Sequence, residues 1–375
     1  QASIALKPII RETKLVRANG IATQCELFLK PENLQNTGSF KLRGSGYKIA
    51  NLSDEEKARG VIACSAGNHA QGVALAATKC GISSLICLPD SAPISKVEAT
   101  KAYGAQVCLV NGCYDDAYQK ALEIRDEKGY TFVHPFDDED VIAGQGTIGM
   151  EILNDLENVD AIIVVPVGSS SAYLESVAET VPVVLIDRYF ENTKLPYVCT
   201  DNYTGSYMAA EYLIDRGYRN ILAIQGVQSS MPNRERVRGF RRAVADHEAK
   251  GVKETIIGDS FSVDNGYAQA MAALSSNGCK PDAIFAFSTT ILLGVIKAVR
   301  DLGLKIPDDV AIISFDNNRF LDFLNPSITR IEQPVNLVGK LVVDCITQLI
   351  DGDDDDHSTP LQTLLRPTLI EGKSC

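Results

Sequence analysis

The sequence predicts an α/β protein in which parallel sheets are flanked by helices. Short apolar runs recur along the chain, and most precede a segment of helical length that ends near a glycine. The stretch 160–173 shows the pattern: a continuous apolar run, then Gly168-Ser169-Ser170-Ser171, then a helix-like segment. Such runs are typical of buried parallel strands, and ligands bind at the carboxyl ends of these strands in doubly wound sheets. The expected architecture is Rossmann-like, with two or three lobes.

Residues 1–158 are expected to form the first part of the fold. Strands are predicted at 26–30, 61–64, 85–88, 107–110 and 131–133, and helices at 68–80, at 94–103 and in a segment that ends at 128. This alternation over roughly 53–150 predicts a Rossmann-like subdomain with a parallel sheet.

Residues 159–375 continue the alternation. Strands are predicted at 182–186, 220–224, 283–286 and 310–314, and helices at 203–216, from 235 onward, at 293–302 and at 335–350. The acidic run 351–356 is expected to be a solvated turn. No low-complexity linker separates the two parts, so their boundary is expected to be a crossover between folded elements rather than a tether.

Composition excludes several classes of partner. The chain has 375 residues, 45% of them hydrophobic and 22% charged, which is ordinary for a globular protein. A formal net charge of -12 disfavours binding to nucleic acid, and no apolar run is long enough to cross a membrane. The ten cysteines form no CxxC pair and no zinc-type cluster, so no metal is expected. Scattered thiols in a long chain favour a reducing, cytoplasmic location.

Lys41 is the candidate catalytic residue. It lies just inside an expected helix start, after Gly38-Ser39-Phe40. The positive end of a helix favours the neutral, nucleophilic form of an amine, and free backbone amides there can hold an anion. These properties suit a Schiff-base lysine on a phosphorylated cofactor. Position alone leaves open the alternative that Lys41 is a solvated surface residue.

A second motif follows the strand expected at 61–64. Ser65-Ala66-Gly67-Asn68-His69-Ala70-Gln71-Gly72 forms a strand-to-helix turn, although its glycines and asparagine also suit an ordinary turn. Gly38-Ser39-Phe40-Lys41-Leu42-Arg43-Gly44 precedes it and Lys96-Val97-Glu98-Ala99-Thr100 follows it. Together, these motifs resemble the threonine dehydratase (threonine ammonia-lyase) family, over roughly residues 7–156.

This resemblance implies the tryptophan-synthase-β-like fold and dependence on pyridoxal phosphate. Lys41 would be the Schiff-base lysine, and Asn68 would be the partner of the cofactor's ring hydroxyl. Ser65, Gly67 and His69 would lie beside the substrate carboxylate.

The resemblance also predicts a phosphate cradle after the next strand. The family has a run of glycines there, whereas this chain has Gly168 followed by Ser169, Ser170 and Ser171. The serines would have to hold the phosphate through backbone amides at a helix start. A Cβ makes the left-handed turn conformations of glycine costly. The later half of the family's site has no counterpart downstream.

The sequence after residue 181 resembles a different family. The fragments that indicate this are Pro182-Val183-Val184-Leu185-Ile186-Asp187-Arg188, Thr200-Asp201-Asn202-Tyr203-Thr204-Gly205, Arg234-Glu235-Arg236-Val237-Arg238-Gly239-Phe240-Arg241, Ile306-Pro307-Asp308-Asp309-Val310, Ser314-Phe315-Asp316-Asn317 and Ile331-Glu332-Gln333-Pro334. In this order they resemble the effector-binding domain of lactose-repressor/galactose-repressor family regulators, a periplasmic-binding-protein-like fold, from about residue 159 to the end. The family's DNA-binding domain is missing.

By this resemblance, Arg236 would donate paired hydrogen bonds to a sugar-like effector, and Asp316 would accept from its hydroxyls. A forked guanidinium and a carboxylate in one cleft suit polyols. The alternatives are a solvated arginine in a basic run and an aspartate that caps the segment after a strand. Ser288 stands where an effector-contacting asparagine is common in the family.

The two resemblances together predict a chimera of two α/β folds joined near residues 160–173; whether it is designed or a natural fusion stays open. Three hypotheses about function follow. The first is a binding module with a small sugar-like ligand in a cleft between lobes and no complete catalytic site. The second is residual threonine or serine ammonia-lyase activity through Lys41 and pyridoxal phosphate. The third is a scaffold that was selected only for folding.

Overall fold

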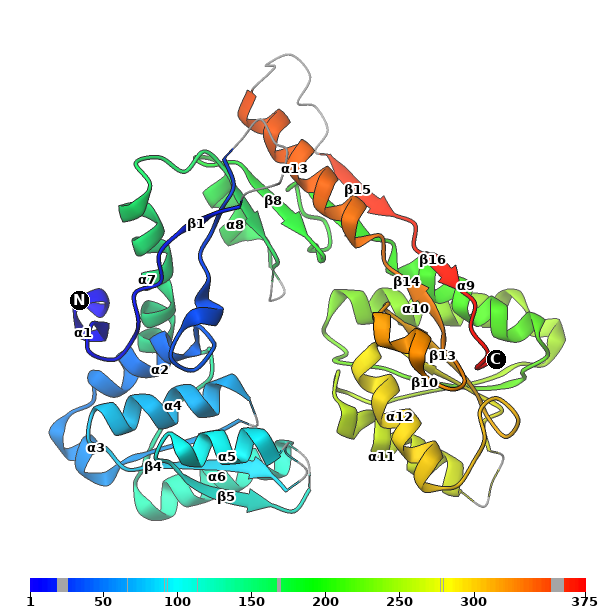
Figure 1. Cartoon of the computed structure of the whole chain (residues 1–375), viewed down its shortest axis with the longest axis horizontal. Helices are drawn as coiled ribbons and strands as arrows, with labels where there is room; N and C mark the ends of the chain where they lie inside the picture. The colour runs from blue at the N-terminus through cyan, green and yellow to red at the C-terminus, as the bar shows by residue number, and fades with distance from the viewer. Residues whose placement is uncertain are drawn as a thin grey trace. The chain divides into compact units, whose positions relative to one another are not determined.

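The computed structural model of the chain confirms the α/β class. It describes residues 1–18, 26–65, 67–90, 92, 94–112, 114–166, 170–276, 278, 280–351 and 361–375. The chain divides into two compact units, Gln1–Val159 and Asp160–Cys375. Figure 1 shows helices flanking the sheets in both. None of the helices in the described ranges combines the length and apolar content that a bilayer crossing requires.

The first unit contains a parallel sheet in the order β5-β4-β3-β6. Its strands are β3 (Val61–Cys64), β4 (Ser84–Pro89), β5 (Gln106–Val110) and β6 (Thr131–Phe132). Its helices are α1 (Ala2–Leu6), α2 (Lys41–Ala50), α3 (Asp54–Arg59), α4 (Asn68–Lys79), α5 (Ile94–Ala102), α6 (Tyr114–Lys128) and α7 (Glu139–Asp155), with a 3-10 turn at η1 (Glu32–Leu34). A small antiparallel pair joins β1 (Val16–Arg17) to β2 (Phe28–Leu29).

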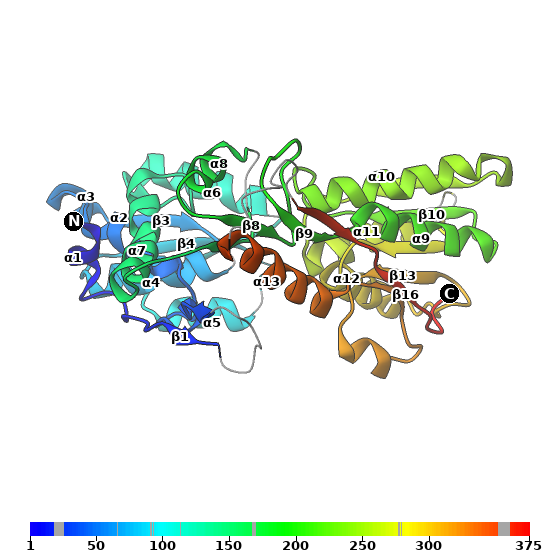
Figure 2. The ribbon, with the colours of Figure 1, turned by 90° about the horizontal axis from the view of Figure 1, so that it is seen from above.

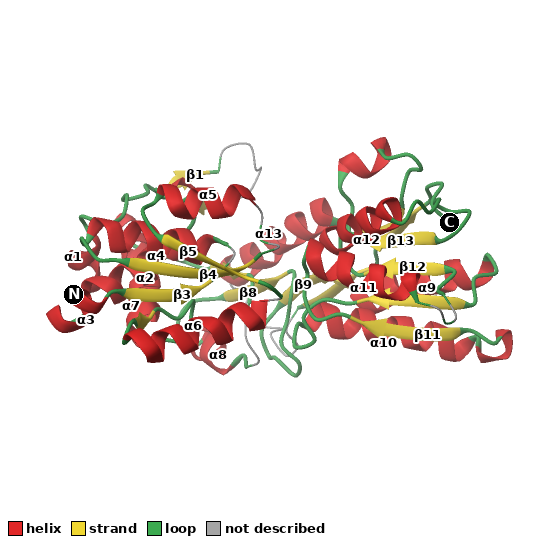
Figure 3. Ribbon diagram, turned by 90° about the horizontal axis from the view of Figure 1, so that it is seen from below, coloured by secondary structure: helices red, strands yellow, loops and turns green. Residues whose placement is uncertain are grey.

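The alternation of side chains along β3 separates two cores. Val61 and Ala63 pack with residues of α2 and α4 on one face of the sheet. Ile62 and Cys64 point to the other face, which α6 covers. Figure 3 shows α4 and α6 on opposite sides of the strands. Because both faces are covered, all four residues of β3 are buried, and the continuous apolar run predicted this strand correctly.

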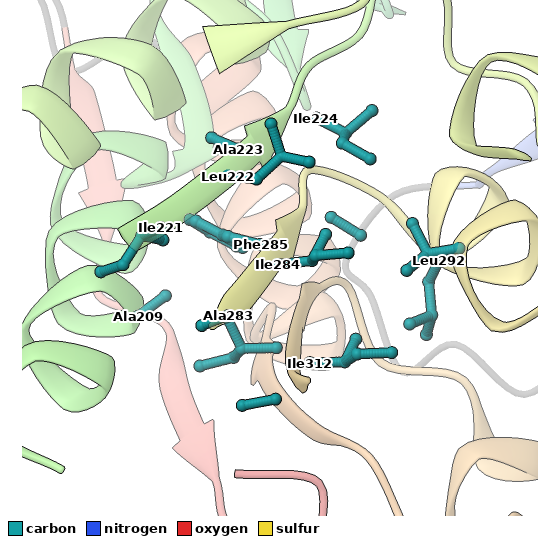
Figure 4. Close-up of a cluster of buried hydrophobic side chains, with 14 of the residues drawn as sticks. Ala209, Ile221, Leu222, Ala223, Ile224, Ala283, Ile284, Phe285, Leu292 and Ile312 are labelled. Atoms are coloured by element: carbon teal, nitrogen blue, oxygen red, sulfur yellow. The ribbon is translucent and has the colours of Figure 1, made fainter. Parts of the chain in front are cut away.

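The larger sheet of the second unit has the order β11-β10-β12-β13-β14-β16. Its strands are β10 (Asn220–Ile224), β11 (Lys253–Ile257), β12 (Ala283–Ala286), β13 (Ala311–Phe315), β14 (Thr329–Glu332) and β16 (Thr368–Ile370). Within the described part of this sheet, β14 and β16 pair antiparallel and the other neighbours pair parallel. Its helices are α9 (Asn202–Asp215), α10 (Met231–Asp246), α11 (Val263–Ser275) and α12 (Thr289–Asp301), with 3-10 turns at η2 (Glu248–Lys250) and η3 (Arg319–Phe323). Figure 4 shows its core, with Ala209 of α9 on one face of the strands and Leu292 of α12 on the other.

The second sheet of this unit has the order β15-β9-β8-β7 and is also parallel. It consists of β7 (Ile162–Val164), β8 (Val183–Ile186), β9 (Tyr197–Thr200) and β15 (Gln362–Leu365), with helices α8 (Ala172–Ala178) and α13 (Val335–Asp351). α13 packs over β8 and β9 (Figure 2). Val338, Val342 and Ile346 of this helix belong to the shared core. The expectation that 160–167 forms a buried strand was wrong in one respect: β7 is an edge strand, and its residues are only half-buried.

Several boundaries differ from the prediction. α10 begins at Met231 rather than near Glu235, because Pro232 stands in its first turn, where the missing N–H costs nothing. α12 begins at Thr289, where the hydroxyl of Ser288 accepts from the amide of Ile291 and caps the helix. α7, β11 and α11 were not predicted at all. The predicted solvated turn at 351–356 lies outside the described residues beyond Asp351.

Candidate functional site

Lys41 is the first residue of α2, and its side chain is partly buried. Its Nζ donates a hydrogen bond of 2.7 Å to the carbonyl of Pro135, just beyond β6. Its backbone amide lies 3.2 Å from the hydroxyl of Ser39. Burial lowers the pKa of the Lys41 amine, which favours the neutral, nucleophilic form. Lys41 is therefore not the solvated surface residue of the alternative hypothesis.

His69 lies in the first turn of α4 and is only 4% exposed. Its Nε2 lies 2.9 Å from the carbonyl of Val133. A carbonyl can only accept, so Nε2 carries the proton and Nδ1 is left as an acceptor. Among the described residues, Nδ1 is buried without a partner. Burial lowers the pKa of His69 to about 4, so the ring is neutral near pH 7.

The segment after β6 thus brings two predicted site residues together, because Lys41 bonds to Pro135 and His69 to Val133. The other members of the 65–69 turn lie nearby in sequence. Ser65 Oγ accepts from the amide of Gly67 at 3.1 Å, and open space surrounds the position of a Cβ on Gly67. Asn68 is exposed, and its Oδ1 accepts from Lys96 Nζ at 3.4 Å.

These side chains fit a carbonyl-bearing cofactor such as pyridoxal phosphate. A partly desolvated amine at Lys41 and an unpartnered acceptor at His69 Nδ1 are polar groups that a bound molecule would satisfy. Lys41 would hold the cofactor, with Asn68 as a further polar contact. When bound, the cofactor supplies an electron sink.

The predicted phosphate cradle belongs to the second unit, and Ser169 lies outside the described residues. Ser170 Oγ accepts from the amide of Ala172 at 3.3 Å, and Ser171 Oγ donates to Glu175 at 2.8 Å. Glu175 also accepts from the amide of Lys194. Both hydroxyls therefore serve local structure, and the carboxylate beside Ser171 would repel a phosphate.

The second candidate site centres on Arg236 of α10, which is 5% exposed. Its Nε donates to Asn202 Oδ1 at 2.8 Å, and its Nη1 donates to the carbonyl of Phe287. Its Nη2 lies 3.5 Å from Asp316 Oδ1. Burial lowers the pKa of Arg236, while Asp316 opposes that effect; an arginine in a protein stays protonated. Arg236 is thus a fixed buried cation rather than a solvated one.

Asp316 follows β13 in the left-handed region, with φ 77°. A non-glycine residue is held there at a cost, and such residues concentrate at ligand sites. Its Oδ1 also accepts from Gln333 Nε2 at 2.5 Å, and about a third of its side chain is exposed. Asp187 after β8 has φ 70° and also contributes a favourable charge at Arg236. Two aspartates at the carboxyl ends of parallel strands therefore act on one guanidinium.

A cavity of about 230 Å³ adjoins this cluster. It is lined by Tyr189, Thr200, Asp201, Asn202, Tyr203, Met231, Glu235 and Leu364. Neither Arg236 nor Asp316 lines it, but Asn202 both lines the cavity and holds the guanidinium. Arg236, Asp316 and Gln333 indicate a ligand position more strongly than the cavity does, because their polar groups converge and Arg236 is almost completely buried.

Residues 6–174 match the family of pyridoxal-phosphate dependent enzymes. Over 170 residues the chain is 53% identical to L-threonine ammonia-lyase of Thermotoga maritima, with 45% of this chain aligned. The chain spans 42% of that relative's length.

Residues 210–375 match the periplasmic binding protein-like domain family. The chain therefore joins two segments that match different families. Its fold is similar to a regulatory protein of the LacI family from Chloroflexus aggregans (24% identity, TM-score 0.56, covering 68% of this chain and 90% of that one). It is also similar to a LacI family transcriptional regulator from Enterococcus faecium with bound ribose (19% identity, TM-score 0.53, covering 67% and 90%). The predicted resemblances are confirmed.

The end of the enzyme-family match does not coincide with the boundary between the two compact units. The enzyme-family match continues to residue 174, through β7 and into α8, beyond the predicted end near Leu156. Yet β7 pairs with β8, and the compact second unit begins at Asp160. Residues of enzyme-family sequence therefore complete a sheet of the binding-protein-like unit.

Three residues of the Arg236 cluster were not predicted from the sequence: Asn202, Gln333 and Phe315. Asn202 and Gln333 lie within the motifs that resemble the second family, and their polar side chains beside the ends of β9 and β14 were a usable signal. Phe315 lies under the guanidinium, 3.7 Å from its carbon to the ring centroid. Phe315 and Arg236 are far apart in the sequence, so no local sequence pattern indicates that their side chains stack.

Proposed function

We propose that the hybrid is a small-molecule-binding protein whose second unit takes a polyhydroxylated, sugar-like ligand at Arg236, Asp316 and Gln333. The observation that supports this most strongly is the buried guanidinium of Arg236, held by Asn202 and Phe287 with Nη2 directed at Asp316. A fixed cation and a partly exposed carboxylate offer a donor and an acceptor to neighbouring hydroxyls.

The contacts of Asp316 favour a hydroxyl ligand over an anion. Gln333 and Arg236 both approach Oδ1, so Oδ2 is the oxygen that a ligand hydroxyl would reach. An anion would meet the carboxylate itself and be repelled. Ribose is bound to the Enterococcus faecium regulator. Pentoses are therefore the first compounds to test on this chain.

Calorimetry with pentoses and hexoses tests the proposal on the full chain. We expect one class of sugar to bind, and Asp316→Asn to weaken it at least tenfold while keeping a side chain that tolerates φ above zero. The matched control is Asp215→Asn, because Asp215 is 57% exposed and pairs with Lys250 at the opposite end of α9 from Asn202. No detectable binding of any sugar, or equal affinity in the two variants, would overturn the proposal.

A second function is favoured by Lys41. We infer that the first unit can bind pyridoxal phosphate at this amine, because it is partly buried and contacts the segment that also holds His69. Turnover of threonine or serine does not follow from this, because the chain spans under half of the lyase it resembles and the hydroxyls of Ser170 and Ser171 are engaged locally.

Absorbance after incubation with pyridoxal phosphate and gel filtration tests this inference. Retained yellow colour should be lost in Lys41→Ala and kept in Lys101→Ala, since Lys101 is 51% exposed on α5. Colour that survives in Lys41→Ala would show labelling of surface lysines and reject the site. Ammonia release from threonine by the coloured protein would establish the lyase hypothesis.

A further inference from the structure

Three cysteines form a row across the sheet of the first unit. The strand register places Cys64 of β3 opposite Cys87 of β4, and Cys87 opposite Cys108 of β5. Register partners in a parallel sheet point to the same face, with the strands about 4.8 Å apart. All three thiols therefore lie on the face that α6 covers, where Ala117 and Ala121 are the neighbours above them.

The three thiols in this row differ in their exposure to solvent. Cys64 and Cys87 are fully buried, whereas Cys108 is partly exposed. Cys108 lies on β5, which ends the order β5-β4-β3-β6 and has no further described strand beside it. A small oxidant in solvent can thus reach Cys108 first, and the thiol next to it is that of Cys87.

The environment of Cys87 shows that its thiol faces its neighbours. Burial raises the pKa of Cys87 to about 12, and the Cys108 and Cys64 thiols shift it in the same direction. Cys64 directs its Sγ toward the carbonyl of Tyr114 at 3.8 Å. No group of three or more His, Cys, Asp or Glu in the described ranges is arranged to hold a metal ion, so the row suggests thiol chemistry rather than a metal site.

The strand spacing allows a bond between Cys87 and Cys108 with some strain. Disulfides span Cα separations of about 4.4–6.8 Å, which includes the interstrand distance, but their Cβ atoms must approach to about 3.8 Å. An edge strand can move toward its neighbour more easily than a central one. A bond formed under strain is readily reduced, as is typical of labile rather than structural disulfides.

We propose that Cys87 and Cys108 form a reversible disulfide when the protein meets a hydroperoxide. The Cys108 thiolate attacks one peroxide oxygen, the O–O bond breaks, and the leaving hydroxide takes up a proton, which leaves a sulfenic acid. The Cys87 sulfur then attacks the Cys108 sulfur. The S–O bond breaks, and the departing hydroxide takes the Cys87 proton as water. Two thiols lose two electrons to one peroxide, and a dithiol reductant reverses the bond.

Peptide mapping of the full chain after treatment with hydrogen peroxide and alkylation tests this proposal. We expect the number of free thiols to fall by two, one linked pair of peptides containing Cys87 and Cys108, and recovery with dithiothreitol. Cys108→Ser and Cys87→Ser should each abolish the link. Cys80→Ser, at a partly buried cysteine in the same unit, should keep it.

Three results would overturn the proposal. They are a link between any other two cysteines, stable over-oxidation of Cys108 with no link, and full retention of free thiols. The peptide map of the wild-type chain alone detects each of these results. The test therefore remains valid even if a serine variant does not fold.

Discussion

The guanidinium carbon of Arg236 lies 3.7 Å from the centroid of the Phe315 ring, so the buried cation of α10 stacks on the side chain that precedes Asp316. A desolvated cation–π contact contributes about 2 kcal/mol. With the hydrogen bonds to Asn202 and Phe287, this contact fixes the plane of the guanidinium and directs Nη2 to Asp316. The ligand proposal depends on that fixed orientation.

Phe315→Leu removes the ring but keeps an apolar side chain. We expect sugar affinity to fall roughly tenfold, which corresponds to about 1.4 kcal/mol, because the guanidinium loses its support. Calorimetry measures the affinity and urea unfolding the stability. The control is Phe285→Leu, since Phe285 is equally buried in the core of the same sheet. It should lower stability similarly and leave affinity unchanged; equal affinities in the two variants would contradict the role of Phe315.

Arg43 carries a positive charge on a fully buried side chain in the first unit. It donates to Glu32 at 2.7 Å and to Glu151 at 2.7 Å. Arg43→Met would leave the partly buried Glu32 carboxylate without a cation, while Glu151 would keep only its ion pair with Lys30 at 2.8 Å. We therefore expect a loss of about 3–5 kcal/mol in the free energy of unfolding. Urea unfolding followed by circular dichroism measures it.

The matched control is Arg17→Met. Arg17 pairs with Glu26 at 2.7 Å, but both side chains are more than half exposed. Such pairs contribute about 0–1 kcal/mol. A similar loss in the two variants would show that burial does not determine the contribution of Arg43.

His69 makes stability depend on pH. Burial lowers its pKa from 6.5 to about 4, so below pH 6.5 the unfolded chain takes up a proton that the folded chain refuses. Stability is therefore full above pH 6.5 and declines as the pH falls toward 4, by about 3 kcal/mol in total. His69→Gln should flatten this decline in urea unfolding curves. His247→Gln, at the end of α10, should leave it unchanged; an unaltered slope in His69→Gln would reject the assignment.

Gly294 permits the close approach of α12 to α11. A Cβ at this position would lie 2.0 Å from the carbonyl of Val263, so Gly294→Ala must push the helices apart. We expect a loss of about 2–3 kcal/mol, measured by thermal unfolding. Gly339→Ala in α13 is the control, because nothing lies within 4 Å of its Cβ. That change should be neutral or stabilise by up to about 1 kcal/mol, and equal effects would contradict the packing argument.

The strands that were predicted well are those whose pattern is local. β3, β8, β10 and β12 are short apolar runs, because both faces of each are covered. β11 was missed because Lys253–Ile257 is an edge strand whose polar residues give no continuous run. The same reasoning misjudged β7, whose apolar run lies at an edge and is only half-buried.

Residue types and their order were sufficient to predict the α/β class, the resemblance to two families, the strand ends that precede Ser65 and Asp316, and the helix that carries Arg236. These depend on residue types and periodicities within a few turns or strands. Tertiary structure alone decided the stacking of Arg236 on Phe315 and the alignment of Cys87 with Cys108. The physical reason is that lateral register and helix-to-sheet contacts join residues distant in sequence, and one-dimensional periodicity holds no information about which strand lies beside which.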